Sequence, residues 1–126
     1  MTAVVDASVM LAIIFGEPGA DQALIAIRGG SMSSVNLSEV LSKCLERGAD
    51  PDFAERQIRR LNISIAAFTA QDAKAAAALR LATRSHGLSF GDRACLALAL
   101  RENAHVLTAD RHWDGVDIGL DIRLIR

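Results

Sequence analysis

Four carboxylates stand where the sequence predicts a strand to end or a helix to begin. Two follow short apolar strands, and two lie in the first turn of a helix. If the strands run parallel, these positions share one edge of the sheet, where ligands bind in open α/β folds. Like charges within ~4 Å repel by a few kcal/mol at an effective dielectric of about 20. The four residues are Asp6, Glu39, Asp92 and Asp110.

A divalent cation removes that repulsion. Oxygen ligands without cysteine or histidine partners favour hard ions such as Mg²⁺ or Mn²⁺. These ions keep several bound waters, and a bound water beside a phosphodiester can serve as a nucleophile. The spacing of the acids therefore predicts metal-assisted hydrolysis.

Each acid also has a structural explanation. Asp6 is placed to cap the helix that follows it, and Asn36 and Glu39 have the spacing of a capping box. Helical periodicity puts Glu39 on the side opposite the apolar stripe, facing solvent. Asp92 suits the positive end of a helix, and Asp110 suits the cap of the next turn. Taken singly these explanations are favoured, whereas convergence of all four on one edge favours a cation site.

The elements that must position these acids alternate along the chain. The stretch of residues 94–100 has no polar residue and predicts a helix buried on nearly all sides. Short strands alternating with helices predict an α/β fold, in which a single domain over residues 1–126 holds a short, mostly parallel β-sheet flanked by helices on both faces. Strands are expected at 3–5, 31–35, 63–67, 105–109 and 122–125, and helices at 8–15, 19–27, 36–47, 51–61, 71–86 and from 92 onward.

Composition excludes several other classes. A chain of 126 residues that is 51% apolar can bury a core, and its net charge of −1 predicts no strong non-specific attraction to nucleic acid or membranes. Cys44 and Cys95 lie in apolar helical patterns, which predicts buried free thiols in a reducing cytosol and no zinc site. No signal segment or membrane-spanning run is present in the sequence, so we expect a cytoplasmic protein.

The segments VVDAS, NLSEV, LSFGDRACLALA and VLTAD, which carry the four acids, resemble a PIN domain, the nuclease fold of VapC-type toxins in toxin–antitoxin pairs. The resemblance covers nearly the whole chain. It implies a Mg²⁺-dependent endoribonuclease that accepts Mn²⁺, acts on RNA, forms a homodimer and is blocked by a cognate antitoxin. It makes Asp6, Asp92 and Asp110 the main metal ligands, while Glu39 holds the metal or its water, or acts as the base.

Five further residues are candidates for supporting roles. The hydroxyls of Ser8 and Thr108 lie beside two of the acids and could hold a water on the metal, or be structural. Asp114 is a possible fifth acid. Arg93 and Arg111 each directly follow a site acid, which suits contact with RNA phosphates or the antitoxin, or an internal ion pair with that acid.

Aromatic residues give no further signal. Trp113 and the phenylalanines are expected in the core, so no base-stacking platform is predicted and RNA recognition should use shape and backbone. His112 is expected to be exposed in a turn. The apolar helix at 9–15, with Phe53 and Leu61, is either part of a dimer or antitoxin groove or ordinary core.

Two other functions fit parts of the same sequence pattern. A non-catalytic PIN-like module whose acidic pocket docks a basic peptide or RNA fits the same acids and is distinguished only by the absence of metal-dependent turnover. A phosphoryl-transfer receiver domain also gathers acids at a sheet edge. It is disfavoured because Asp6 has no acidic neighbour and no lysine follows Lys74.

Overall fold

One five-stranded sheet organises the computed structural model, which describes residues 2–126. The strand order is β3-β2-β1-β4-β5, and every neighbouring pair in this part of the chain is parallel. The predicted parallel α/β sheet is therefore confirmed. The strands are β1 (Ala3–Val5), β2 (Ser31–Ser33), β3 (Ser64–Ala66), β4 (His105–Thr108) and β5 (Ile122–Leu124).

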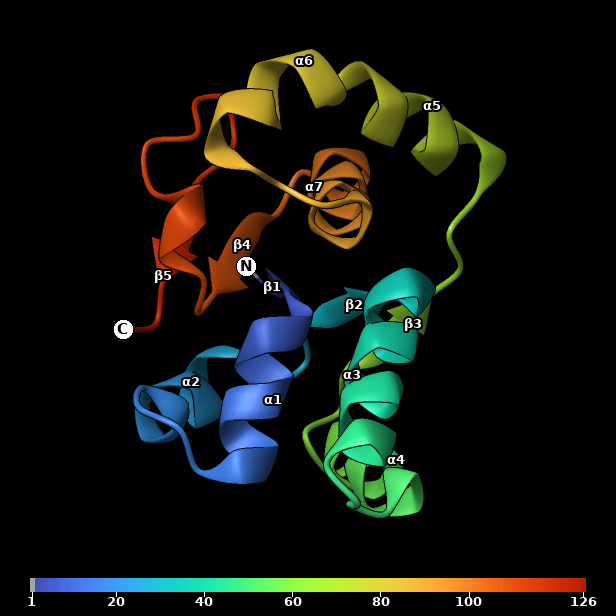
Figure 1. Cartoon of the computed structure of the whole chain (residues 1–126), viewed down its shortest axis with the longest axis vertical. Helices are drawn as coiled ribbons and strands as arrows, with labels where there is room; N and C mark the ends of the chain where they lie inside the picture. Colours follow the sequence, from blue (N-terminus) through green and yellow to red (C-terminus); the bar gives the residue numbers. More distant parts are fainter. Residues whose placement is uncertain (1) are drawn as a thin grey trace.

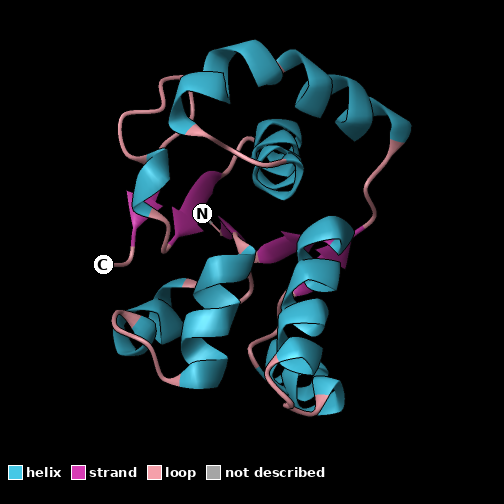
Figure 2. Ribbon diagram, viewed as in Figure 1, coloured by secondary structure: helices cyan, strands magenta, loops and turns pink. Residues whose placement is uncertain are grey.

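Helices cover both faces of the sheet, as predicted (Figures 1 and 2). One face carries α1 (Ala7–Phe15), α2 (Ala20–Ala26), α3 (Ser34–Glu46) and α4 (Pro51–Arg60). The other carries α7 (Phe90–Glu102), over which α5 (Ala70–Ala78) and α6 (Arg80–Thr83) form an arc (Figure 1). Two 3₁₀ turns, η1 (Arg84–His86) and η2 (Arg111–Trp113), complete the elements.

The central strand β1 serves two cores because successive side chains point to opposite faces of a sheet. Val5 packs into the core beneath α1 to α4, and Val4 packs into the core beneath α7. All three residues of β1 are buried. A strand covered on both faces reads as a continuous apolar run, which is what the sequence has at this position.

Helix α7 confirms the prediction of a buried central helix. Every residue from Ala94 to Ala99 is buried, and only Leu100 at the end of the apolar run is 41% exposed. Ser89 caps the start of the helix, and Asn103 ends it in the left-handed conformation, which asparagine tolerates better than most residues. The helix runs back from the carboxyl edge of the sheet and leads directly into β4.

The single helix predicted at 71–86 is wrong. The chain instead forms α5, α6 and η1, which bend around α7 (Figure 1). The buried Thr83 hydroxyl donates to the carbonyl of Leu79 at 2.9 Å, where the turn tightens. Threonine back-bonding of this kind bends helices, so a long alanine-rich run is broken where it must follow a curved surface.

The boundary between β2 and α3 also differs from the prediction. The Ser33 hydroxyl accepts a hydrogen bond from the Val35 amide at 3.2 Å and caps α3, so the strand ends at Ser33 and the helix begins at Ser34. The predicted Asn36–Glu39 capping box is therefore wrong. Asn36 lies inside α3 and Glu39 lies in its second turn.

Smaller expectations hold with boundary shifts of one or two residues. Cys44 and Cys95 are both buried and free. Helix α7 begins at Phe90, two residues before the predicted start, so Gly91 lies inside its first turn. Across residues 2–126, no helix combines the length and apolar character needed to cross a membrane.

Candidate active site

Asp6 is tied to two hydroxyls at the carboxyl edge of the sheet. It directly follows β1 and is 3% exposed. Its Oδ2 accepts hydrogen bonds from Ser8 Oγ at 2.6 Å and from Thr108 Oγ1 at 2.9 Å. The same hydroxyls accept from the amides of Ala109 and Asp110. Asp6 makes no side-chain cap on α1, so its structural explanation is wrong, and its carboxylate instead joins α1 to the end of β4.

Glu39 comes from α3 and lies against the first turn of α7. The Asn36 amide Nδ2 donates to Glu39 Oε1 at 2.7 Å and to the Gly91 carbonyl at 2.9 Å. Asn36 is completely buried, and Glu39 is partly buried. The prediction that Glu39 faces solvent at a helix start is therefore wrong. The sequence pattern did not assign Asn36 or Gly91 to the site; the one signal for Asn36 was an amide within the apolar stripe of a helix.

Asp92 and Asp110 both have the structural roles that the sequence allowed. Asp92 forms a capping box with Ser89, whose amide donates to Asp92 Oδ2 at 2.8 Å. Asp110 follows β4 and caps η2, accepting from the His112 amide at 2.9 Å. The His112 ring Nδ1 lies 2.8 Å from the same Asp110 oxygen. These bonds engage one oxygen of each carboxylate.

The charges of the site acids act on one another. Burial raises the pKa of Asp6 to about 7, and the charges of Asp92 and Glu39 add to the rise against the hydrogen bonds from the two hydroxyls. Burial also raises the pKa of Glu39 and of Asp92, with further increases from Asp92 and from Asp110 respectively. Burial and the charges of Asp6, Asp92 and Glu39 raise the pKa of the Cys95 thiol.

The donor set fits a hard divalent cation in its chemistry. Among residues 2–126, Asp6, Glu39 and Asp92 form no ion pair with lysine or arginine. Carboxylates that are buried or half-buried without a counterion are costly, and a cation offsets that cost. In the described chain, however, no group of three acidic, histidine or cysteine side chains is arranged so that it could hold a metal ion.

The supporting candidates separate into two groups. Ser8 and Thr108 join the site through Asp6. Asp114 is exposed, and its side chain makes no hydrogen bond within residues 2–126. Arg93 donates to the carbonyl of Ala76, and Arg111 donates to that of Arg126.

Neither arginine pairs with the acid that precedes it in the described structure, so the internal ion-pair explanation is wrong. The hydroxyls therefore belong to the acidic site, and both arginines point elsewhere.

The aromatic residues only partly follow the prediction. Trp113 is buried in the core and His112 is exposed, as expected. The expectation that the phenylalanines lie in the core is wrong for Phe53, 41% exposed, and for Phe90, 51% exposed. Phe90 begins α7 and packs edge-to-face on Phe68, with ring centroids 5.4 Å apart.

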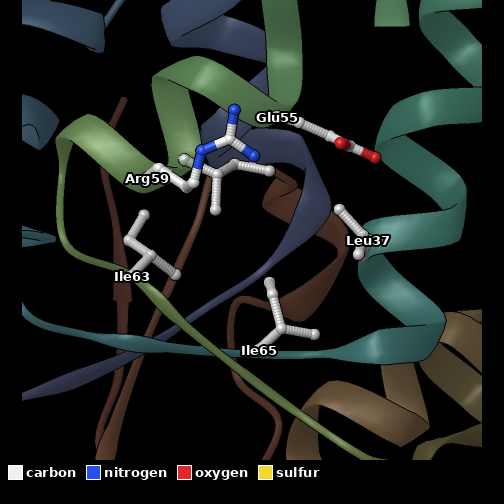
Figure 3. Close-up of a pocket in the computed structure, with 6 residues that line it drawn as sticks. Leu37, Glu55, Arg59, Ile63 and Ile65 are labelled. Carbon is white, nitrogen blue, oxygen red and sulfur yellow. The ribbon is translucent and has the colours of Figure 1, made fainter. Parts of the chain in front are cut away.

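The apolar helix α1 and Leu61, for which the sequence left open a groove or ordinary core, pack into or against the core. Val9 and Leu61 are buried, and Phe15 is partly buried with the Arg47 guanidinium 4.4 Å from its ring centroid. A separate hollow of about 250 Å³ lies between α3, α4 and β3 (Figure 3). None of the four acids lines it. Its lining residues are Leu37, Glu55, Ile58, Arg59, Ile63 and Ile65.

Comparison with known proteins agrees with this architecture. The PIN domain family model matches residues 3–119. A toxin–antitoxin complex from Klebsiella pneumoniae is similar with a TM-score of 0.76 at 20% identity, over 99% of this chain and 98% of that chain. DNA-bound VapBC from Salmonella typhimurium gives 0.72 at 15% identity, over 100% of both chains.

VapBC2 from Rickettsia felis, bound to a DNA fragment from its promoter, gives a TM-score of 0.70 at 16% identity, over 98% of both chains. No curated protein matched the sequence. Because the family model spans most of the chain, the protein belongs to the PIN domain family.

Proposed function

We propose that this PIN domain is a metal-dependent endoribonuclease that acts as the toxin of a VapC-type toxin–antitoxin pair. One observation carries the proposal. Carboxylates that follow β1 and β4 and project from α3 and α7 belong to one edge of a fully parallel sheet, and three of them lack a basic partner in the described chain.

In this proposal Asp6, Asp92 and Asp110 hold Mg²⁺, or Mn²⁺ as a substitute, and Glu39 holds the ion or its water or takes up the proton. When bound, the ion neutralises the carboxylates and lowers the pKa of water near the phosphodiester. Ser8 and Thr108 both donate to Asp6 Oδ2, which fixes the orientation of that carboxylate and leaves Oδ1 without a hydrogen bond in the described part of the chain.

The proposal includes a partner protein. The solved relatives from Klebsiella pneumoniae, Rickettsia felis and Salmonella typhimurium are toxin–antitoxin complexes, which supports a cognate antitoxin that blocks the acidic edge. Arg93 and Arg111 remain candidates for contact with RNA or the antitoxin, and Asp114 for a fifth acid. We also propose that the protein is a homodimer and lies in the cytoplasm. Light scattering on the purified chain tests the dimeric state.

The direct test is RNA cleavage by purified, partner-free protein in the presence of EDTA, Mg²⁺ or Mn²⁺. We expect cleavage only with metal, and its loss by at least about 100-fold in Asp92→Asn and Asp110→Asn, because each removes a charged ligand. Asp21→Asn, an exposed acid on α2, is the matched control and should cleave normally. Full cleavage by both site variants would refute the proposal.

One observation favours a second function. Since no three side chains enclose an ion as placed in residues 2–126, the acidic edge also suits a non-catalytic module that docks a basic peptide or RNA. This module would bind its partner equally well in EDTA and would show no turnover. Cleavage that requires Mg²⁺ or Mn²⁺ excludes it.

A further inference from the structure

Asn36 is a buried side chain with an unusual set of partners. It is 0% exposed, and its Nδ2 donates to Glu39 Oε1 at 2.7 Å and to the Gly91 carbonyl at 2.9 Å. The two hydrogens of one amide therefore bridge a carboxylate on α3 and the backbone of α7. Its Oδ1 has no hydrogen-bond partner in the described structure.

Burying an amide with an unsatisfied oxygen lowers stability, and an apolar residue of similar size would avoid that cost. Packing thus gives no reason for an amide at this position. The features that only an amide donor supplies are its two bonds, one to the Glu39 carboxylate and one to the Gly91 carbonyl, and the first is the stronger because its acceptor is charged.

Gly91 leaves room for the Glu39 carboxylate against the first turn of α7. A Cβ built on Gly91 would lie 2.5 Å from Glu39 Oε1 and 2.6 Å from both Cδ and Oε2. Real Cβ atoms do not approach other atoms so closely. The backbone at Gly91 does not have a positive φ, so conformation does not require glycine there. Glycine is a poor helix former, but here it leaves space that the Glu39 carboxylate occupies, and a Cβ at this position would require that carboxylate to move.

We propose that Asn36 and Gly91 are positioning residues that hold the Glu39 carboxylate against the first turn of α7, beside Asp92, before metal or RNA binds. Without them, repulsion from Asp92 and Asp6 would drive the flexible glutamate side chain out toward solvent. The inference rests on the proposed function, because it assigns these residues to the acidic site.

The test measures Mn²⁺ binding by titration calorimetry on folded wild type, Asn36→Ala and Gly91→Ala. We expect each substitution to weaken Mn²⁺ binding by about 10- to 100-fold, as is typical when a residue that orients a ligand is lost. The control is Thr83→Ala, which removes another buried hydrogen bond far along the chain in α6. It should lower the melting temperature and leave Mn²⁺ affinity unchanged.

A compensating substitution separates positioning from general damage. Glu39→Asp shortens the side chain by one methylene and withdraws the carboxylate from Gly91. In the Glu39→Asp background, Gly91→Ala should therefore have little further effect on either Mn²⁺ affinity or melting temperature. Folded Asn36→Ala and Gly91→Ala proteins that bind Mn²⁺ as tightly as wild type would overturn the proposal.

The same set of variants distinguishes this inference from the proposed function. If wild type binds no Mn²⁺, the metal site of the proposed function fails, and melting temperatures then decide the positioning role. If Asn36→Ala does not fold, the melting temperatures of the Gly91→Ala proteins likewise decide whether Glu39 is held in position. A loss of stability from Gly91→Ala that disappears in the Glu39→Asp background supports positioning, and equal losses in both backgrounds refute it.

Discussion

At the scale of single residues, Asp6 combines burial with a charge that the fold does not neutralise. An aspartate in an unfolded chain has a pKa near 3.9, whereas burial raises that of folded Asp6 to about 7. Between these two values the folded state binds more protons than the unfolded state. Stability therefore falls as the pH rises from about 4 to about 7, and it stays reduced above that range.

The fall in stability when Asp6 ionises predicts the effect of Asp6→Asn. Each pKa unit corresponds to about 1.4 kcal/mol, so removing the charge should raise the free energy of unfolding by about 1–3 kcal/mol at pH 8. Near pH 4 the variant and wild type should have similar stability, because Asp6 is already protonated. Urea denaturation at the two pH values measures the difference.

Asp114→Asn is the control for loss of a negative charge at an exposed position and should leave stability unchanged at both pH values. An Asp6→Asn protein that is no more stable than wild type at pH 8 would contradict the assignment. A gain in stability together with loss of RNA cleavage is the pattern expected when a fold keeps a costly charge for function.

At the scale of elements, the same capping motif occurs twice with different surroundings. Thr69 and Asp72 cap α5, and Ser89 and Asp92 cap α7. Asp72 is also bound through both oxygens by Arg101, and although burial acts to raise its pKa, these bonds lower it. Asp92 has no such arginine partner in the described chain, and burial, with a smaller contribution from the charge of Asp110, raises its pKa.

Removing the two caps should therefore have one effect in common and one that differs. Ser89→Ala and Thr69→Ala should each lower the free energy of unfolding by about 1 kcal/mol, since each removes an N-cap oxygen. Only Ser89→Ala changes the surroundings of a proposed metal ligand, so only that variant should change Mn²⁺ affinity. Urea denaturation and titration calorimetry measure the two quantities; equal Mn²⁺ affinities would contradict a role for Asp92 as a ligand.

At the scale of the whole molecule, stability is concentrated in the middle of the sheet. Strands β1 and β4 are buried throughout and are joined to α1 by the Asp6 bonds, whereas β3 at the edge is largely exposed. Native-state hydrogen exchange should therefore be slowest in β1, β4 and the buried turns of α7. We expect amides of β3 to exchange at least about tenfold faster, and equal protection of β3 and β1 would contradict this.

The order of elements could be predicted because it depends on local patterns. Short apolar runs beside turn residues mark the strands, and an unbroken apolar run marks α7. The predicted helix boundaries are wrong where contacts with residues distant in the sequence determine the local structure. Thr83 breaks an alanine-rich helix that has to bend over α7, and Ser33 takes the capping role that spacing alone assigns to Asn36.

The sequence by itself determined the parallel α/β class, the central helix and the boundary positions of Asp6, Asp92 and Asp110, because apolar periodicity and strand ends are properties of neighbouring residues. Only the tertiary structure decided how those acids are held. The Asp6 bonds to Thr108 and the Asn36 bond to Gly91 join residues 102 and 55 positions apart. Such contacts exist only once the sheet is assembled, and no local pattern in one chain specifies them.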